Sequence, residues 1–110
     1  MRGRLASELL GLPVRLHGID IGRPTQILVD VQADRVLGFE VICGDEAQRF
    51  LPFAVADLRD GEIAIESALT LIDERDLEFY RRRSRRLQEL GMASPCIDGD
   101  GHIYEALRAA

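Results

Sequence analysis

The sequence predicts a mainly β fold: a small antiparallel β-barrel followed by one C-terminal α-helix. Two observations lead to this prediction. Over residues 1–72, short apolar runs alternate with turn residues, at the spacing of about 8–12 residues that is typical of small barrels and sandwiches. Residues 73–90 instead carry the apolar periodicity and the terminal residues of a helix. Residues 91–110 form a glycine-bearing tail, which we expect to be a short hairpin or disordered.

The first half of the β region contains three expected strands. Two lie at residues 13–16 and 21–29, on either side of a turn that contains Gly18. Because Pro24 has no N–H to donate to a ladder, that end of its strand should lie at a sheet edge or a bulge. Residues 36–43 alternate most clearly, and Gly38 and Glu40 share the face opposite the apolar side chains. A glycine in mid-strand also indicates a bend or a bulge.

The second half of the β region continues with strands at residues 48–53 and 62–66, the latter after a hairpin turn at Asp60-Gly61. Residues 54–58 suit either a loop or a short helical turn, and residues 69–72 offer a sixth strand. From the alternation, the side chains expected inside the barrel are Leu37, Phe39, Val41, Ile63 and Ile65.

The helix at residues 73–90 begins at Asp73, a suitable N-cap, and ends before Gly91, a suitable C-terminal cap. At about 100° per residue, its apolar side chains span an arc of about 160°. The members of this arc are Leu77, Tyr80, Ser84, Leu87, Leu90 and Phe79. The arc is wide for one stripe on a small barrel. We therefore expect Phe79 and Leu90 to lie at its margin and to contact a second copy in a homodimer.

The order of these segments resembles the PRC-barrel family over roughly residues 9–71. The shared pieces are Leu9-Leu10-Gly11-Leu12-Pro13-Val14, Ile21-Gly22, Val29-Asp30, Arg35 to Val41, Leu51-Pro52-Phe53 and a closing acidic-Gly hairpin. The resemblance implies a small β-barrel that serves as a docking module. PRC-barrel proteins share no catalytic residues, so the resemblance assigns none here. The PRC-barrel family also includes a ribosome maturation factor, which binds a ribosomal protein.

Catalytic and metal-binding patterns are weak in this sequence. His17 and His102 both lie in turns beside glycine, and neither belongs to a nucleophile motif. Asp57, Asp60 and Glu62 cluster around one turn, but nothing near them in the sequence indicates the burial that a general acid needs. Residues 98–102 alternate acids with glycines yet lack the glycine and glutamate positions of an EF-hand. We therefore expect no enzyme activity, no metal and no cofactor.

The arginine run at residues 81–86 is the one strongly basic segment. On a continuous helix, Glu78 lies four residues before Arg82, and Arg85 lies four before Glu89, so ion pairs would partly neutralise the run. The chain as a whole has a net charge of −5. This favours a solvated, salt-bridged helix over a phosphate-binding surface, and it makes nucleic acid an unlikely partner.

These observations predict a non-catalytic adaptor, or protein-interaction module, with an unidentified protein partner. The alternative is a factor associated with RNA or ribosome assembly that uses the arginine-rich helix or binds a ribosomal protein. The candidate interaction residues are Phe79, Leu90, Arg81, Arg82, Arg85 and Arg86. The sequence contains no secretory signal pattern and no run of about 20 apolar residues for a membrane span. We therefore expect a cytoplasmic protein.

Overall fold

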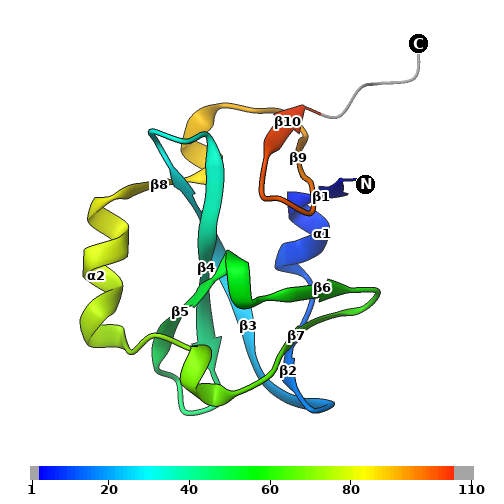
Figure 1. Ribbon diagram of the computed structural model, residues 1–110, viewed down its shortest axis with the longest axis vertical. Coiled ribbons are helices and arrows are strands. Elements are labelled where there is room, and N and C mark those ends of the chain that lie inside the picture. Colours follow the sequence, from blue (N-terminus) through cyan, green and yellow to red (C-terminus); the bar gives the residue numbers. More distant parts are fainter. Residues whose placement is uncertain (1–2, 106–110) are drawn as a thin grey trace.

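Residues 3–105 are described by the computed structural model (Figure 1). The chain is mainly β, with 48% strand and 23% helix, in agreement with the sequence analysis on this point. The strands form two sheets, and neither sheet closes into a barrel. The described residues contain two α-helices, α1 (Ala6–Leu10) and α2 (Glu74–Arg82). The expected closed barrel with a single C-terminal helix is therefore wrong.

The larger sheet is organised around one long strand, β3 (Ile19–Asp30). One edge of β3 pairs with β4, and the other edge pairs first with β2 and then, further along, with β8 (Ser84–Arg86). All strand pairs in this sheet are antiparallel except β2 with β7. The remaining strands are β2 (Val14–Leu16), β4 (Arg35–Cys43), β5 (Gln48–Pro52), β6 (Asp57–Arg59) and β7 (Glu62–Ile65).

The smaller sheet joins the two ends of the described chain, in the order β1-β9-β10 (Figure 1). Its strands are β1 (Arg4–Leu5), β9 (Pro95–Ile97) and β10 (Ile103–Glu105). Strands β9 and β10 form an antiparallel hairpin, so the hairpin alternative for the tail is confirmed as far as Glu105. Residues 106–110 of that predicted tail, and residues 1–2 of the predicted β domain, lie outside the described residues.

Two bulges interrupt the pairing of β3 with β4. Gln26 pairs with Glu40 whereas Pro24 pairs with Val41, so the additional residue in β3 follows Pro24, as its missing N–H predicts. At the second bulge, Leu28 pairs with Gly38 and Val29 pairs with Val36, which leaves Leu37 without a partner. A one-residue shift moves a side chain to the other face of a sheet.

The bulge explains why one predicted core residue is misplaced. Val36 and Phe39 both face the main core, whereas Leu37 is half-buried and packs on the opposite side, against α2. The other expected interior residues, Phe39, Val41, Ile63 and Ile65, are at most 4% exposed and belong to the main core, so their predicted burial is confirmed.

A second apolar layer lies between the sheet and α2. It is built from Leu28, Phe50 and Leu77, with the Tyr80 ring stacked on Phe50 at a centroid separation of 4.3 Å. Gly38 makes room for Phe50, because a Cβ on Gly38 would lie 2.5 Å from the Phe50 ring. The sheet is thus covered on two sides where β3, β4 and β5 lie side by side.

The large sheet stays open because its end strands, β5 and β6, do not pair with each other. A 3-10 turn, η1 (Phe53–Val55), connects them and redirects the chain. The sixth strand expected at residues 69–72 is wrong: a 3-10 turn, η2 (Ala68–Thr70), replaces it, and Ile72 makes a single bridge to Phe50. The Ser67 hydroxyl oxygen caps this turn by accepting from the Leu69 N–H.

The single helix expected over residues 73–90 is also wrong. Asp73 caps its start as predicted, but α2 ends at Arg82, and the chain continues as β8 and the 3-10 helix η3 (Leu87–Leu90). The Ser84 hydroxyl donates to the Tyr80 carbonyl at 2.7 Å, and pairing of β8 with the end of β3 replaces the helical hydrogen bonds. Neither α-helix in residues 3–105 has the length and apolar composition needed to cross a membrane.

An ion pair between a buried carboxylate and a partly exposed arginine joins α2 to the sheet. Glu40 is 5% exposed on the face that the sequence suggested was polar, and its carboxylate accepts from the Arg81 guanidinium at 2.6 Å. Arg81 also donates to the Gln48 side chain at 2.9 Å. The alternation correctly placed Glu40 opposite the main core, but α2 covers that face.

We expect Phe39→Ala to lower the free energy of unfolding by about 3–5 kcal/mol, because the ring is fully buried and its removal leaves a cavity. Chemical denaturation followed by circular dichroism measures this. The matched control is Phe79→Ala, since the Phe79 side chain is 52% exposed and should contribute far less. Equal effects of the two substitutions would contradict the assignment of Phe39 to the core.

We expect Arg81→Ala to destabilise the protein by about 1–2 kcal/mol, because it leaves the Glu40 carboxylate buried without its cation and Arg81 itself is partly solvated. Arg82→Ala is the control, since Arg82 is largely exposed. Adding Glu40→Gln to Arg81→Ala should recover part of the loss. A double variant no more stable than Arg81→Ala would show that the carboxylate charge is not the cause.

Candidate functional site

A groove with a volume of about 660 Å³ lies where the large sheet fails to close. Its lining comes from the two end strands and the turn between them, at residues 52–54 and 56–58, and from the start of β4 at residues 35–37. The small sheet completes it through residues 97–100 and Arg4. Segments that are far apart in the sequence therefore meet around one opening.

The floor of the groove is apolar. Phe53 and Leu58 are half-buried and pack against the main core, of which Val36 and Ile97 are buried members. Phe53 contacts Phe39 with ring centroids 6.2 Å apart, so the floor rests on the fully buried centre of the sheet. Such a floor is already formed before a ligand arrives, and pre-formed apolar surfaces of this kind suit the apolar side chains of a ligand.

The outer edge of β6 runs along this groove without a strand partner among the described residues. Within the β6–β7 hairpin, Leu58 lies opposite Ile63. The N–H of Ile63 donates to the Pro13 carbonyl at 2.9 Å, so the peptide groups of Ile63 face away from β6. Opposed residues in an antiparallel pair turn their peptide groups the same way relative to the partner strand, so the N–H and C=O of Leu58 also face away from β7. They point to the free edge.

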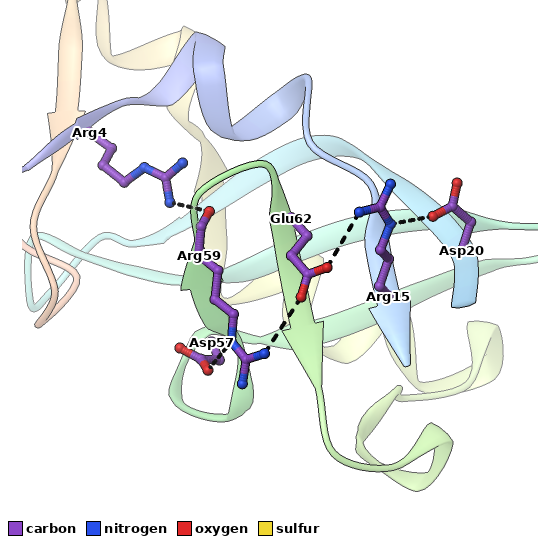
Figure 2. A network of polar contacts seen from close by, with 6 residues as sticks. All are labelled: Arg4, Arg15, Asp20, Asp57, Arg59 and Glu62. Atoms are coloured by element: carbon purple, nitrogen blue, oxygen red, sulfur yellow. Dashed lines mark hydrogen bonds and ion pairs between the residues drawn. The ribbon is translucent and has the colours of Figure 1, made fainter. Parts of the chain in front are cut away.

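A network of charged side chains holds this hairpin in place (Figure 2). The Arg59 guanidinium donates to Asp57 at 2.8 Å and lies 3.7 Å from Glu62, while Arg15 bonds both Asp20 and Glu62. The hydrogen bonds that Arg59 and Arg15 donate to Asp57 and Asp20 raise the pKa values of the two guanidinium groups, which stay charged. Two of the three predicted turn carboxylates, Asp57 and Glu62, thus serve to position Arg59.

Arg4 connects the network to the small sheet. Its guanidinium donates to the carbonyl oxygen of Arg59 at 2.9 Å, as Figure 2 shows, and so ties β1 to β6. By the alternation of the ladder, Asp57 and Arg59 turn their peptide groups toward β7, so Leu58 is the residue of β6 with outward-facing peptide groups.

The turn between β9 and β10 forms the opposite rim. The N–H of Val36 donates to the Gly101 carbonyl at 2.8 Å, which pins the turn to the start of β4. Gly101 has a φ of 85°, and a Cβ there would lie 3.3 Å from the Phe53 ring, so glycine allows both the turn and this close approach.

Asp98, Asp100 and His102 bring their potential ligand atoms within 4.8 Å of one another, the one such group in the part of the chain that the structure describes. The Asp98 carboxylate already accepts from the N–H groups of Asp100 and His102, both at 2.9 Å, and lies 3.3 Å from the His102 ring. Burial acts to raise the pKa of Asp98, but these donors outweigh it and hold that pKa below its ordinary value. The cluster is thus engaged in supporting the turn.

The other histidine, His17, lies in an exposed turn with a φ of 51°. It borders a small hollow of about 120 Å³ together with Asp57, Glu62 and Glu66. Two of these three carboxylates contact Arg59.

The residues singled out from the sequence do not form one face. Phe79 is exposed on α2, whereas Leu90 belongs to η3 and packs against the main core, so the pair predicted for a homodimer is divided between two elements. Arg81 and Arg82 end α2, and Arg85 and Arg86 lie in β8. The structure keeps the arginines in one region of the molecule but not on one helix.

The groove residues escaped the sequence analysis, which treated residues 54–58 as a connection and residues 91–110 as a tail. The signals that were present are the Asp60-Gly61 turn, which predicts β6 as half of a hairpin, and Gly101. Comparison of the chain with models of known protein families and with curated proteins found no match.

We expect the stability of the β9–β10 turn to depend on pH through Asp98. Because its folded-state pKa is depressed, its contribution is present above the unfolded value of about 3.9 and is lost as pH falls through the folded value. Asp98→Asn keeps an acceptor oxygen for the two N–H donors but does not titrate. The protection factor of the His102 amide, which is the intrinsic exchange rate at each pH divided by the measured rate, should fall between about pH 5 and pH 2 in the wild type and much less in this variant. Parallel profiles would contradict the role of Asp98.

Proposed function

We propose that this protein is a non-catalytic interaction module that binds an extended segment of a partner protein in the groove, as an added strand on β6. One observation carries the proposal: the outward N–H and C=O of Leu58 lie on a strand edge that has no partner within residues 3–105, along a groove with an apolar floor. Peptides that add to a sheet edge gain affinity from main-chain hydrogen bonds and specificity from alternate side chains.

The shape of the groove defines the ligand. An extended strand points successive side chains to opposite faces, so alternate residues of the peptide would meet the floor formed by Phe53, Leu58 and Ile97. The intervening residues would face the charged rim, where Arg35 and Asp100 are both exposed. We therefore expect apolar residues at every second position of the bound segment.

Two further observations agree with this proposal. The motif order at residues 9–71 resembles PRC-barrel sequences, a family of docking modules, although the closed barrel that the resemblance implied is not formed. Both cysteines, Cys43 and Cys96, are free thiols, the state that a reducing cytoplasm maintains. On this basis we propose a cytoplasmic location for the module.

Selection of 12-residue peptides from a displayed library on the full chain should yield binders that alternate apolar residues and that shift the amide signals of Leu58 and Phe53 in NMR titration. Leu58→Pro removes the outward N–H at an edge position where proline is compatible with a strand. We expect it to weaken such a peptide about tenfold beyond any effect of Leu58→Ala, the value of one lost hydrogen bond.

Leu58→Ala is the matched control, because it removes the same packing against the core but keeps the N–H. Thermal melts of both variants establish that β6 is retained. Equal affinity of the two variants, selected peptides that leave the Leu58 and Phe53 signals unchanged, or a library without binders would each refute strand addition at β6.

A further inference from the structure

The end of α2 changes the charge balance of the arginine run. The predicted Arg85–Glu89 ion pair requires a helix that continues beyond Arg82, and it does not form. The Glu89 carboxylate instead accepts from the backbone N–H of Arg86 at 3.0 Å, as the cap of η3. Arg85 is left without an ion pair within residues 3–105.

Three of these arginines converge on an open hollow of about 520 Å³ beside the β3–β4 turn. Arg82, Arg83 and Arg85 line it, and Asp30 is the one acid among its lining residues. The Asp30 carboxylate accepts from the backbone N–H of Gln32 at 2.9 Å and so stabilises the turn. The Arg82 guanidinium lies 3.8 Å from Glu78, the ion pair that the sequence predicted, so Arg83 and Arg85 supply the positive charge that no carboxylate pairs with in residues 3–105. Guanidinium groups bind phosphate oxygens in bidentate fashion, which makes the hollow a candidate site for anions.

An exposed aromatic ring adjoins this hollow. A second hollow of about 450 Å³ shares Arg82 and Arg83 with the first and is also lined by Phe79 and Glu78. The Arg83 guanidinium carbon lies 4.0 Å from the centroid of the Phe79 ring, and Phe79 is 52% exposed. Exposed aromatic rings and guanidinium planes are the surfaces on which unpaired bases stack.

We infer that this surface, formed by Phe79, Arg82, Arg83 and Arg85, binds single-stranded nucleic acid, with phosphates in the arginine hollow and a base against Phe79. The net charge of −5 and the acids of α2, Glu74, Asp76 and Glu78, would repel a broad anionic membrane. A single strand contacts only the narrow basic surface. The arginine surface is separate from the peptide groove, because the two sites share no lining residue.

Fluorescence anisotropy with a labelled 12-nucleotide oligouridine tests this on the full chain. The logarithm of the association constant should fall with the logarithm of salt concentration with a slope near −2, about −0.7 for each of three phosphates. The triple variant Arg82→Gln, Arg83→Gln, Arg85→Gln should lose binding and the salt dependence, and Phe79→Ala should weaken binding about tenfold. Arg75→Gln is the control, because Arg75 is exposed on the same helix beyond both hollows.

Wild-type binding that the Arg75 control retains and the triple variant loses would support the inference, provided that the thermal melts of all variants coincide. Absence of binding at low salt would overturn it, and so would equal losses in the Arg75 control and the triple variant. Binding to vesicles rich in phosphatidylserine but not to oligouridine would also overturn it, in favour of a lipid surface.

Discussion

The bulge at Leu37 determines which side chains of β4 face each of the two apolar layers. Before it, Val36 faces the main core, and after it Phe39 and Val41 do so, while Leu37 faces α2. Because neighbouring residues in a regular strand alternate, this distribution needs the extra residue. Glu40 lies on the face of β4 that is turned toward α2 and there accepts a hydrogen bond from Arg81. The bulge therefore determines the position of α2 on the sheet, and α2 in turn positions the arginines of β8.

Much of the strand pattern follows from local sequence. Ile63 and Ile65 alternate with less buried residues beside a turn with Gly61, and Pro24 marks a real bulge, because these effects depend on near neighbours. The end of α2 does not follow from the same rules. Arginine favours helices, and the apolar spacing of Leu77, Leu87 and Leu90 suits one, yet Leu87 reaches the main core only after the chain leaves the helix.

The candidate sites could not be predicted from the sequence for a related reason. The groove takes lining residues from β1, β4, β6 and the β9–β10 turn, and none of these carries a motif on its own. The decisive groups at Leu58 are backbone atoms, whose direction depends on the pairing partner rather than on the side chain. The arginine surface is different: its residues were visible in the sequence, and the predicted Glu78–Arg82 pair forms, but the pairing of Arg85 with Glu89 was inferred from a helix that stops at Arg82.

The small sheet bears on the order in which the molecule can assemble. Arg4 pairs with Ile97, so β1 obtains its strand partner only after nearly the whole described chain is available, whereas α1 contacts β3, which follows it closely in the sequence. Closing such a long loop is slow relative to forming the β6–β7 hairpin. We therefore expect the wall of the groove that β9 supplies to form late in folding, after the edge of β6.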